Sequence, residues 1–191
     1  AQLKRAMLEI IKDLEEKNRD GGRDRFNIML FSTGTEWLLG EGLKEASDPS
    51  VINQARQAIE GAEAKGWTNI GEALEQAINL LRDEKIGSGT SNRLTQTVYC
   101  LTDGRPVLPQ GNPVKAQVIS RDVIRDQIFA ANENADGEAE IQVHTMAFGN
   151  DADEVALKEI AQDNFGLYRK IYSDSDANLQ LRGFFKEASA I

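Results

Sequence analysis

Predicted helices and strands alternate along this chain, and this order limits the fold classes that it can adopt. Apolar residues recur at helical spacing over residues 3–14, 48–63, 70–81, 114–131, 155–161 and 176–188, which predicts amphipathic helices there. Short apolar runs over residues 26–31, 37–39, 97–102, 141–148 and 167–172 predict strands. Because strands separated by helices pair in parallel through right-handed crossovers, the sequence predicts an α/β fold with a mainly parallel sheet wrapped by helices.

The length and composition are typical of one globular domain. Of the 191 residues, 40% are hydrophobic and 28% are charged, which provides enough apolar side chains for a core. The sequence has neither internal repeats nor a low-complexity segment, and no apolar run is long enough to span a bilayer. No basic-then-apolar leader opens it. We predict a single domain over residues 1–191, with no membrane span in this chain.

The net charge of −9 argues against nucleic acid as a partner, because an acidic surface repels phosphate backbones and no compact Lys/Arg cluster offsets it. Cys100 is the only cysteine, which excludes an internal disulfide. His144 is the only histidine, which excludes a histidine-based metal cluster within this chain. His144 also lies within a predicted strand, where a packed or edge residue is expected rather than a general base.

Polar residues follow several predicted strands, at the end where open α/β sheets bind their ligands. They are Ser32, Thr33, Asp103, Arg105, Asn150, Asp151 and Asp153. Asp103 leaves strand 97–102 directly into Gly104, and a carboxylate in this place can hold a hard cation or simply form an Asx-type turn. For Asp151, Asp153 and Glu154 a helix start, where acidic side chains complement the dipole, is favoured over a calcium site.

Thr68 is a second candidate, immediately before the predicted helix 70–81. A threonine in this place is ordinarily the N-cap. Asn69 and Glu72, however, have the spacing of a capping box, so that Asn69 can cap the helix and leave the Thr68 hydroxyl to another partner. The helix start also offers free N–H groups to an anionic ligand. Trp67 beside it can be a partner-facing anchor or a packed indole.

Several segments, taken in order, resemble the von Willebrand factor A (VWA) domain family. They are Asp24 to Thr33, Gly66 to Leu74, Leu101 to Gly104 and Val143 to Gly149, with Leu157 to Tyr168 similar to the end of the family's fold. Each segment is weak by itself, whereas the ordered set covers residues 1–190 and is far more specific. The resemblance implies a Rossmann-like, doubly wound, mainly parallel sheet with helices on both faces.

In this family the carboxyl ends of the strands carry a metal-ion-dependent adhesion site (MIDAS). The resemblance implies a divalent cation there, usually Mg²⁺ with Ca²⁺ or Mn²⁺ as alternatives, held by oxygen atoms from three loops. A carboxylate of a partner protein completes the shell. Matched residue by residue, Thr68 is the expected threonine ligand and Asp103 the expected aspartate ligand, and no catalytic residue is implied.

The sequence departs from the family at the third loop of this site. The family's Asp-x-Ser-x-Ser loop follows a central strand that precedes the first helix, and this chain begins at that helix. Thr68 and Asp103 are two ligands of the about six that Mg²⁺ requires, and a sheet without its central strand leaves backbone groups unpaired. We expect an upstream segment, rather than another polypeptide, to provide the strand and its loop.

Three functions remain open from the sequence. A protein-binding, adhesion-type module, whose ligand carboxylate binds through the cation, is favoured, in an exported protein that is extracellular or periplasmic. The alternative is a metal-independent, structural VWA-like domain that packs within a larger protein. An enzyme that uses a nucleotide or phosphate is not favoured, because the sequence contains no G-x-G-x-x-G, G-x-x-x-x-G-K-[S/T] or G-x-S-x-G motif.

Overall fold

The computed structural model describes residues 2–63, 68–88, 95–105, 107–109, 116–118 and 120–172, together with residues 180, 183, 184 and 187. Contacts divide the chain into two compact units that interleave in sequence. The first unit comprises Ala1–Leu30, Glu36–Ala64 and Ser173–Ile191, and the second comprises Phe31–Thr35 and Lys65–Tyr172. The single-domain organisation over residues 1–191 stays a prediction.

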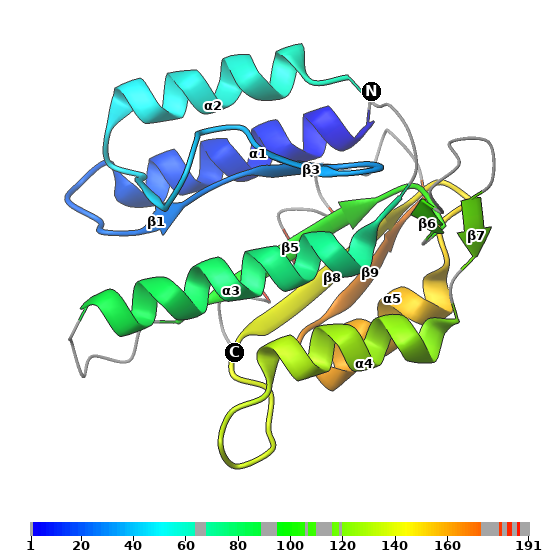
Figure 1. Cartoon of the computed structure of the whole chain (residues 1–191). Helices are drawn as coiled ribbons and strands as arrows, with labels where there is room; N and C mark the ends of the chain where they lie inside the picture. Colours follow the sequence, from blue (N-terminus) through cyan, green and yellow to red (C-terminus); the bar gives the residue numbers. More distant parts are fainter. Residues whose placement is uncertain are drawn as a thin grey trace. The chain divides into compact units, whose positions relative to one another are not determined.

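The first unit contains two long helices (Figure 1). Helix α1 spans Gln2–Asn18 and helix α2 spans Pro49–Gly61, and the two pack on each other. One cluster of buried aliphatic residues in this unit comprises Ile11, Ile28, Leu39, Ile52, Ala55 and Ile59. The Asp48 carboxylate caps α2 by accepting a hydrogen bond from the Ser50 N–H at 2.8 Å, which confirms the predicted helix start.

The second unit is built on a parallel three-stranded sheet (Figure 1). Its strands are β5 (Thr97–Thr102), β8 (Gln142–Phe148) and β9 (Tyr168–Ile171), in the order β5-β8-β9. Helix α3 (Ile70–Ser88) packs on β5, α5 (Glu154–Asp163) packs on β8 and β9, and α4 (Arg121–Asn132) packs on both α3 and α5. Parallel strands joined through helices confirm the predicted α/β class.

Aliphatic side chains from the sheet and its three helices form the core of this unit. They are Ile70, Leu74, Ile78, Cys100, Ile124, Ile128, Ile141, Val143, Ala147, Leu157 and Ile160. Helix α3 contributes Ile70, Leu74 and Ile78, whose four-residue spacing places them on one helical face. Burial of one such side chain stabilises the fold by roughly 1.5–3 kcal/mol. In the described part of the chain, no helix has the length and apolarity of a membrane span.

Three short strand pairs complete the described strands. Strand β1 (Arg25–Phe26) pairs with β4 (Lys44–Glu45), β2 (Met29–Phe31) with β3 (Thr35–Trp37), and β6 (Val107–Pro109) with β7 (Ala116–Val118). The prediction of one continuous buried strand over residues 26–31 is therefore wrong. Asn27 interrupts it, because its amide donates to the Gly40 and Gly42 carbonyl oxygens, both at 2.7 Å, and its side-chain oxygen accepts from the Ile28 N–H.

Two predicted helix boundaries also differ from the structure. The helix predicted over residues 114–131 begins only at Arg121, because Ala116–Val118 form strand β7, antiparallel to β6. Apolar residues alternate with polar ones from Val114 to Val118, a period of two that indicates a strand. Helix α3 continues to Ser88, beyond the predicted end at residue 81. Most of the helix predicted over residues 176–188 lies outside the described residues.

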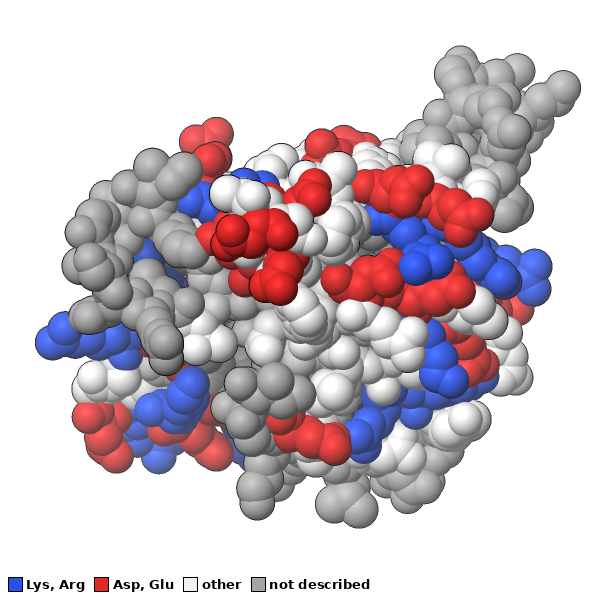
Figure 2. Space-filling model, turned by 90° about the horizontal axis from the view of Figure 1, so that it is seen from below, with Lys and Arg blue, Asp and Glu red and all other residues white. Residues whose placement is uncertain are grey.

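Ion pairs join α4 to α5 at the surface of the second unit. Arg125 donates to both carboxylate oxygens of Asp163, at 2.7 and 3.0 Å, and lies 3.5 Å from Glu159. Arg121 pairs with Asp153 at 3.0 Å. Figure 2, which views the molecule from below Figure 1, shows acidic and basic side chains next to one another on this face. Exposed pairs of this kind contribute at most about 1 kcal/mol each, so they orient the helices more than they stabilise them.

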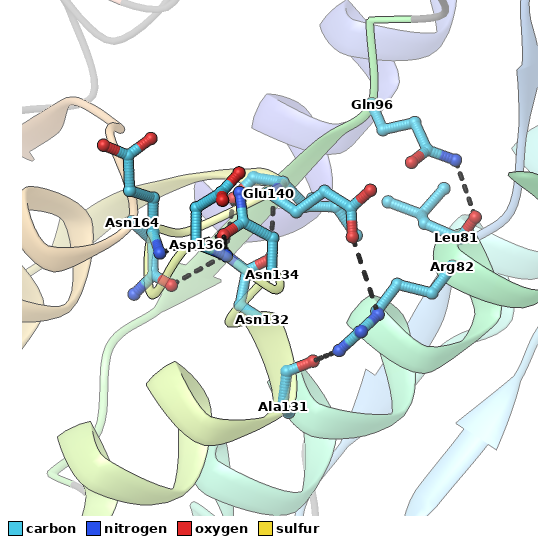
Figure 3. A network of polar contacts seen from close by, with 11 residues as sticks. Leu81, Arg82, Gln96, Ala131, Asn132, Asn134, Asp136, Glu140 and Asn164 are labelled. Atoms are coloured by element: carbon cyan, nitrogen blue, oxygen red, sulfur yellow. Dashed lines mark hydrogen bonds and ion pairs between the residues drawn. The ribbon is translucent and has the colours of Figure 1, made fainter. Parts of the chain in front are cut away.

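Two buried asparagines connect the end of α4, the start of β8 and the end of α5 (Figure 3). The Asn132 amide donates to the Ile141 carbonyl oxygen at 2.7 Å and to Asn164 Oδ1 at 2.8 Å, and Asn132 Oδ1 accepts from the Ile141 N–H at 2.8 Å. The Asn164 amide donates to the Ile160 carbonyl oxygen at 2.8 Å. Asn132 is 0% exposed and Asn164 is 1% exposed, so these hydrogen bonds replace those that water would make.

Candidate functional site

The structure brings Thr68 to the turn that follows β5. A Cβ placed on Gly104 would overlap the Thr68 hydroxyl oxygen and would lie 3.3 Å from the Thr68 Cβ. Gly104 directly follows Asp103, and its N–H donates to the Thr102 hydroxyl oxygen at 3.2 Å. Thr68 therefore lies against the turn that contains Asp103, at the carboxyl end of β5.

Asn69, rather than Thr68, caps α3. The Asn69 side-chain oxygen accepts from the Glu72 N–H at 3.4 Å, and the Asn69 amide donates to the Glu72 carboxylate at 2.6 Å. This pair confirms that Asn69 can cap the helix in place of Thr68. Among the residues that the structure describes, the side chains of Thr68 and Asp103 take part in no hydrogen bond or ion pair. Asp103 is exposed at this turn, and Thr68 is half-buried.

The loop between β2 and β3 contacts the same helix start. The Ser32 carbonyl oxygen accepts from the Asn69 N–H at 2.9 Å. The Thr35 hydroxyl donates to Gln76 Oε1 at 2.9 Å, and the Gln76 amide donates to the Glu72 carboxylate at 3.1 Å. The sequence does not predict these hydrogen bonds of Thr35 and Gln76. A four-residue spacing such as that of Glu72 and Gln76 occurs on every helix, so it does not single out this pair.

The other polar residues predicted to follow strands have separate places. Asp153 caps α5 by accepting from the Ala156 N–H at 3.1 Å, and it pairs with Arg121, which confirms its place at a helix start. Burial acts to raise the pKa of Asp153, but the hydrogen bonds from Arg121 and the Ala156 N–H outweigh it and hold that pKa below its ordinary value. Arg105, Asn150 and Asp151 are exposed, and Trp67 lies outside the described residues.

Comparison with known proteins places this arrangement in a family. The sequence pattern of the von Willebrand factor type A domain matches residues 1–187. The chain belongs to this family. Inter-alpha-trypsin inhibitor heavy chain H3 of Mesocricetus auratus is 32% identical over 189 residues, and heavy chain H4 of Homo sapiens is 32% identical over 193 residues. Each match covers 98% of this chain but only 19% and 18% of those two proteins, so the chain spans about a fifth of their length.

Solved structures of other VWA proteins have the same fold. A von Willebrand factor type A protein from Catenulispora acidiphila matches with a TM-score of 0.68 and 16% identity, over 96% of this chain and 37% of that chain. The pilus adhesin SpaC from Lactobacillus rhamnosus GG matches with a TM-score of 0.70 and 12% identity, over 98% of this chain and 27% of that chain. These matches confirm the Rossmann-like α/β fold.

A third solved structure is proximal thread matrix protein 1 from the mussel byssus, whose MIDAS motif is occupied by zinc. It matches the VWA domain described here with a TM-score of 0.60 and 17% identity, over 96% of this chain and 41% of that chain. At this identity the match establishes the shared fold. Whether the ion has a counterpart here depends on the donor atoms of this chain.

The donor atoms at the Asp103 turn suit a hard cation in kind, but two of them do not complete a shell. A hydroxyl and a carboxylate oxygen are ligands that Mg²⁺ and Ca²⁺ prefer, and Mg²⁺ requires about six. Within the described residues of this VWA domain, no group of three or more His, Cys, Asp or Glu side chains is placed to hold a metal ion. Thr68 and Asp103 therefore supply two oxygen atoms of the kinds that such cations bind.

The single cysteine and the single histidine of the VWA domain are buried in its sheet. Burial raises the pKa of Cys100 to about 12, so its thiol stays protonated at neutral pH. His144 is 0% exposed in β8, and its ring stacks on Tyr99 with 5.2 Å between the ring centroids. His144 Nδ1 accepts from the Leu167 N–H at 2.9 Å. The prediction of a packed His144 is confirmed.

Acidification below pH 6.5 is expected to destabilise the VWA domain through His144. Burial lowers the pKa of His144 below the ordinary 6.5, so the unfolded chain takes up the proton first. The contribution of His144 to the free energy of unfolding is complete above pH 6.5 and declines as the pH falls toward the folded-state pKa, by at most about 1.4 kcal/mol per pH unit. Urea unfolding measured from about pH 7.5 to about pH 5, where most carboxylates stay ionised, checks this.

A His144→Gln variant is the control for this pH dependence, since glutamine does not titrate and can still accept from the Leu167 N–H. The stability of this variant should stay nearly constant over the same pH interval. An equally steep decline in the variant would assign the proton uptake to another group.

Proposed function

We propose that this VWA domain is a protein-binding module whose ligand binds through a divalent cation. Thr68 and Asp103 each supply one oxygen ligand, with Mg²⁺ as the expected ion and Ca²⁺ or Mn²⁺ as alternatives. The observation that supports the proposal is the close approach of the Thr68 hydroxyl to Gly104, the residue after Asp103, at the carboxyl end of β5. The zinc-occupied MIDAS motif of the mussel protein, which has the same fold, supports it.

The other positions around the ion are assigned to the family's Asp-x-Ser-x-Ser loop, to water and to the partner. When bound, the cation supplies a positive charge that an acidic side chain of a partner protein can coordinate. Thr68 and Asp103 hold two oxygen atoms in place at the carboxyl ends of the strands. They leave the other coordination positions of the ion to further ligands. The domain accordingly acts by binding and not by catalysis, and nucleic acid is not its partner because its net charge is −9.

We also propose that residues 1–191 form one domain of an exported protein, either extracellular or periplasmic. The similarity to inter-alpha-trypsin inhibitor heavy chains over 98% of the chain supports this placement.

Addition of Mg²⁺ to the natural full-length protein is expected to stabilise it through this site. A ligand that binds only the folded state stabilises it by about 2.7 kcal/mol at a concentration a hundredfold above its Kd. Asp103→Ala and Thr68→Ala should each remove most of this effect, because each loses one oxygen ligand. Thermal unfolding with and without Mg²⁺ measures it.

Asp151→Ala is the matched control for the cation experiment, since Asp151 is also an exposed aspartate that follows a strand of the same sheet. Its Mg²⁺ effect should equal that of the unaltered protein. If Mg²⁺, Mn²⁺ and Ca²⁺ all leave the unfolding temperature unchanged, the cation-dependent function is wrong.

A metal-independent, structural role is the second candidate function. It is favoured by one observation, that the described residues contain no group of three or more His, Cys, Asp or Glu side chains placed to hold a metal ion. In that case Asp103 only forms a turn, and partner binding should persist in a Thr68→Ala, Asp103→Ala double variant and in the presence of a chelator. A binding measurement on that double variant separates the two functions.

A further inference from the structure

Thr68 lies next to a residue that makes several hydrogen bonds. Asn69 next to it is 4% exposed and makes hydrogen bonds through its backbone N–H and through both ends of its side chain. We infer that Asn69 and Glu72, supported by Gln76 and Thr35, are positioning residues for the Thr68 hydroxyl. This inference rests on the proposed cation site, because it concerns how one of its two ligands is held.

The first step is the competition for the N-cap of α3. A threonine hydroxyl next to a helix start ordinarily accepts from a free backbone N–H of the first turn. Here the Glu72 N–H is taken by Asn69 Oδ1 at 3.4 Å. The Thr68 hydroxyl therefore does not accept from the Glu72 N–H. Asn69, one residue later in the chain, caps the helix instead.

The second step is the chain of hydrogen bonds behind the cap. One Glu72 carboxylate oxygen accepts from the Asn69 amide at 2.6 Å and the other accepts from the Gln76 amide at 3.1 Å. Gln76 Oε1 in turn accepts from the Thr35 hydroxyl at 2.9 Å. Because donors and acceptors alternate along this chain, the Asn69 amide has one orientation, with its oxygen toward the helix.

The third step fixes the backbone that carries Thr68. The Asn69 N–H, which belongs to the peptide unit joining Thr68 to Asn69, donates to the Ser32 carbonyl oxygen at 2.9 Å. This bond ties the peptide unit to the loop between β2 and β3. The relay through Gln76 and Thr35 ties the helix to the same loop.

The fourth step is steric. Gly104 has no side chain, and any Cβ there would overlap the Thr68 hydroxyl oxygen and lie 3.4 Å from the Thr68 Cγ2. The backbone next to Thr68 is thus held by the hydrogen bonds of Asn69, and the Thr68 side chain lies against Gly104. Gly104 sets how closely the hydroxyl approaches the Asp103 turn, and the relay sets its direction.

The test compares two glutamates on the same helix. In Glu72→Ala the Asn69 amide loses its acceptor, and the affinity of the natural full-length protein for Mn²⁺ is expected to fall about 10-fold or more, the usual range for residues that orient a metal ligand. Glu75→Ala is the control, because Glu75 lies on the same helix and accepts a side-chain hydrogen bond from the Gln127 amide at 2.7 Å, outside the relay. Its Mn²⁺ affinity should stay within about 2-fold. Calorimetric titration gives both affinities.

Glu72→Gln is the conservative rescue. Its side-chain oxygen can accept from the Asn69 amide, and its NH₂ can donate to Gln76 once the Gln76 amide turns over. Most of the Mn²⁺ affinity should therefore return in Glu72→Gln, whereas a role limited to helix stability predicts no link between affinity and this hydrogen bond. Unfolding temperatures without metal identify any variant that is simply less stable.

Gly104→Ala tests the steric step without removing a hydrogen bond, and it serves as the second variant if Glu72→Ala does not fold. It should weaken Mn²⁺ binding about 10-fold in the presence of Thr68, and it should have little further effect in a Thr68→Ala background. Equal affinities in Glu72→Ala, Gly104→Ala and the unaltered protein overturn the positioning role and leave the cation site standing. Absence of Mn²⁺ binding in the unaltered protein overturns the cation site and this inference with it.

Discussion

Replacement of Asn132 by alanine is expected to lower the free energy of unfolding by about 4 kcal/mol, since a buried polar group left without its partner costs about 1–3 kcal/mol. The substitution removes the acceptor of the Ile141 N–H and the donor to the Ile141 carbonyl oxygen. It also removes the donor to Asn164 Oδ1. Denaturant unfolding followed by circular dichroism measures the loss.

Asn134→Ala is the matched control for this variant, two residues further along the chain. The Asn134 side-chain oxygen accepts from the Asp136 and Glu138 N–H groups at 2.9 and 3.0 Å, in an exposed turn where water can replace both bonds. Its loss should therefore cost only about 1 kcal/mol. Similar losses in the two variants would show that the burial of Asn132 is not what makes it important.

Replacement of Gly166 by alanine is the second substitution with a large expected effect, about 3 kcal/mol or more. A Cβ at this position would overlap the Val143 carbonyl oxygen, lie 2.5 Å from the Val143 carbonyl carbon and lie 3.1 Å from the His144 nitrogen. These are backbone atoms of β8, so a side-chain rotation cannot make room. The strand would have to separate from the chain segment between α5 and β9, and the loss is measured by denaturant unfolding.

Gly61→Ala provides the comparison for Gly166. Gly61 is the last residue of α2, and a Cβ there would meet no atom within 4 Å. Alanine at this position should be neutral or should stabilise by up to about 1 kcal/mol, because it reduces the freedom of the unfolded chain. If Gly166→Ala is as mild as Gly61→Ala, the close approach of the backbone to β8 is not maintained in solution.

The sequence predicts best those parts of the fold that have a clear local signal, such as an apolar run or a helix cap. Strand β5 has the predicted bounds, Thr97–Thr102, because a continuous apolar run ends in an Asp-Gly turn. The start of α2 is also correct, since Asp48 and Pro49 form a local start signal. The strand over residues 26–31 fails because Asn27 bonds to carbonyl groups of Gly40 and Gly42, which lie outside any local sequence window.

The sequence predicts which residues to examine at the candidate site, but it does not predict the contacts that surround them. The sequence shows that Asp103 follows a predicted strand and that Thr68 precedes a predicted helix. Strand ends and helix starts meet at one edge of an α/β sheet, so both residues are expected at that edge. The absence of a side chain at Gly104 matters only through its contact with Thr68, from a loop far away in the chain. Likewise, the bond between Thr35 and Gln76 depends on how the β2–β3 loop packs on α3.

The pairing of β5, β8 and β9 affects the order in which this protein can acquire its structure. Thr97 pairs with Gln142 and Thr145 pairs with Tyr168, so each ladder joins segments that are distant along the polypeptide. Bringing such segments together reduces chain entropy before any ladder hydrogen bond compensates, which makes the step slow relative to helix formation. A partly folded species with its helices in place but without this sheet has no common edge at which Thr68 could reach Asp103, so the proposed cation site can form only late in folding.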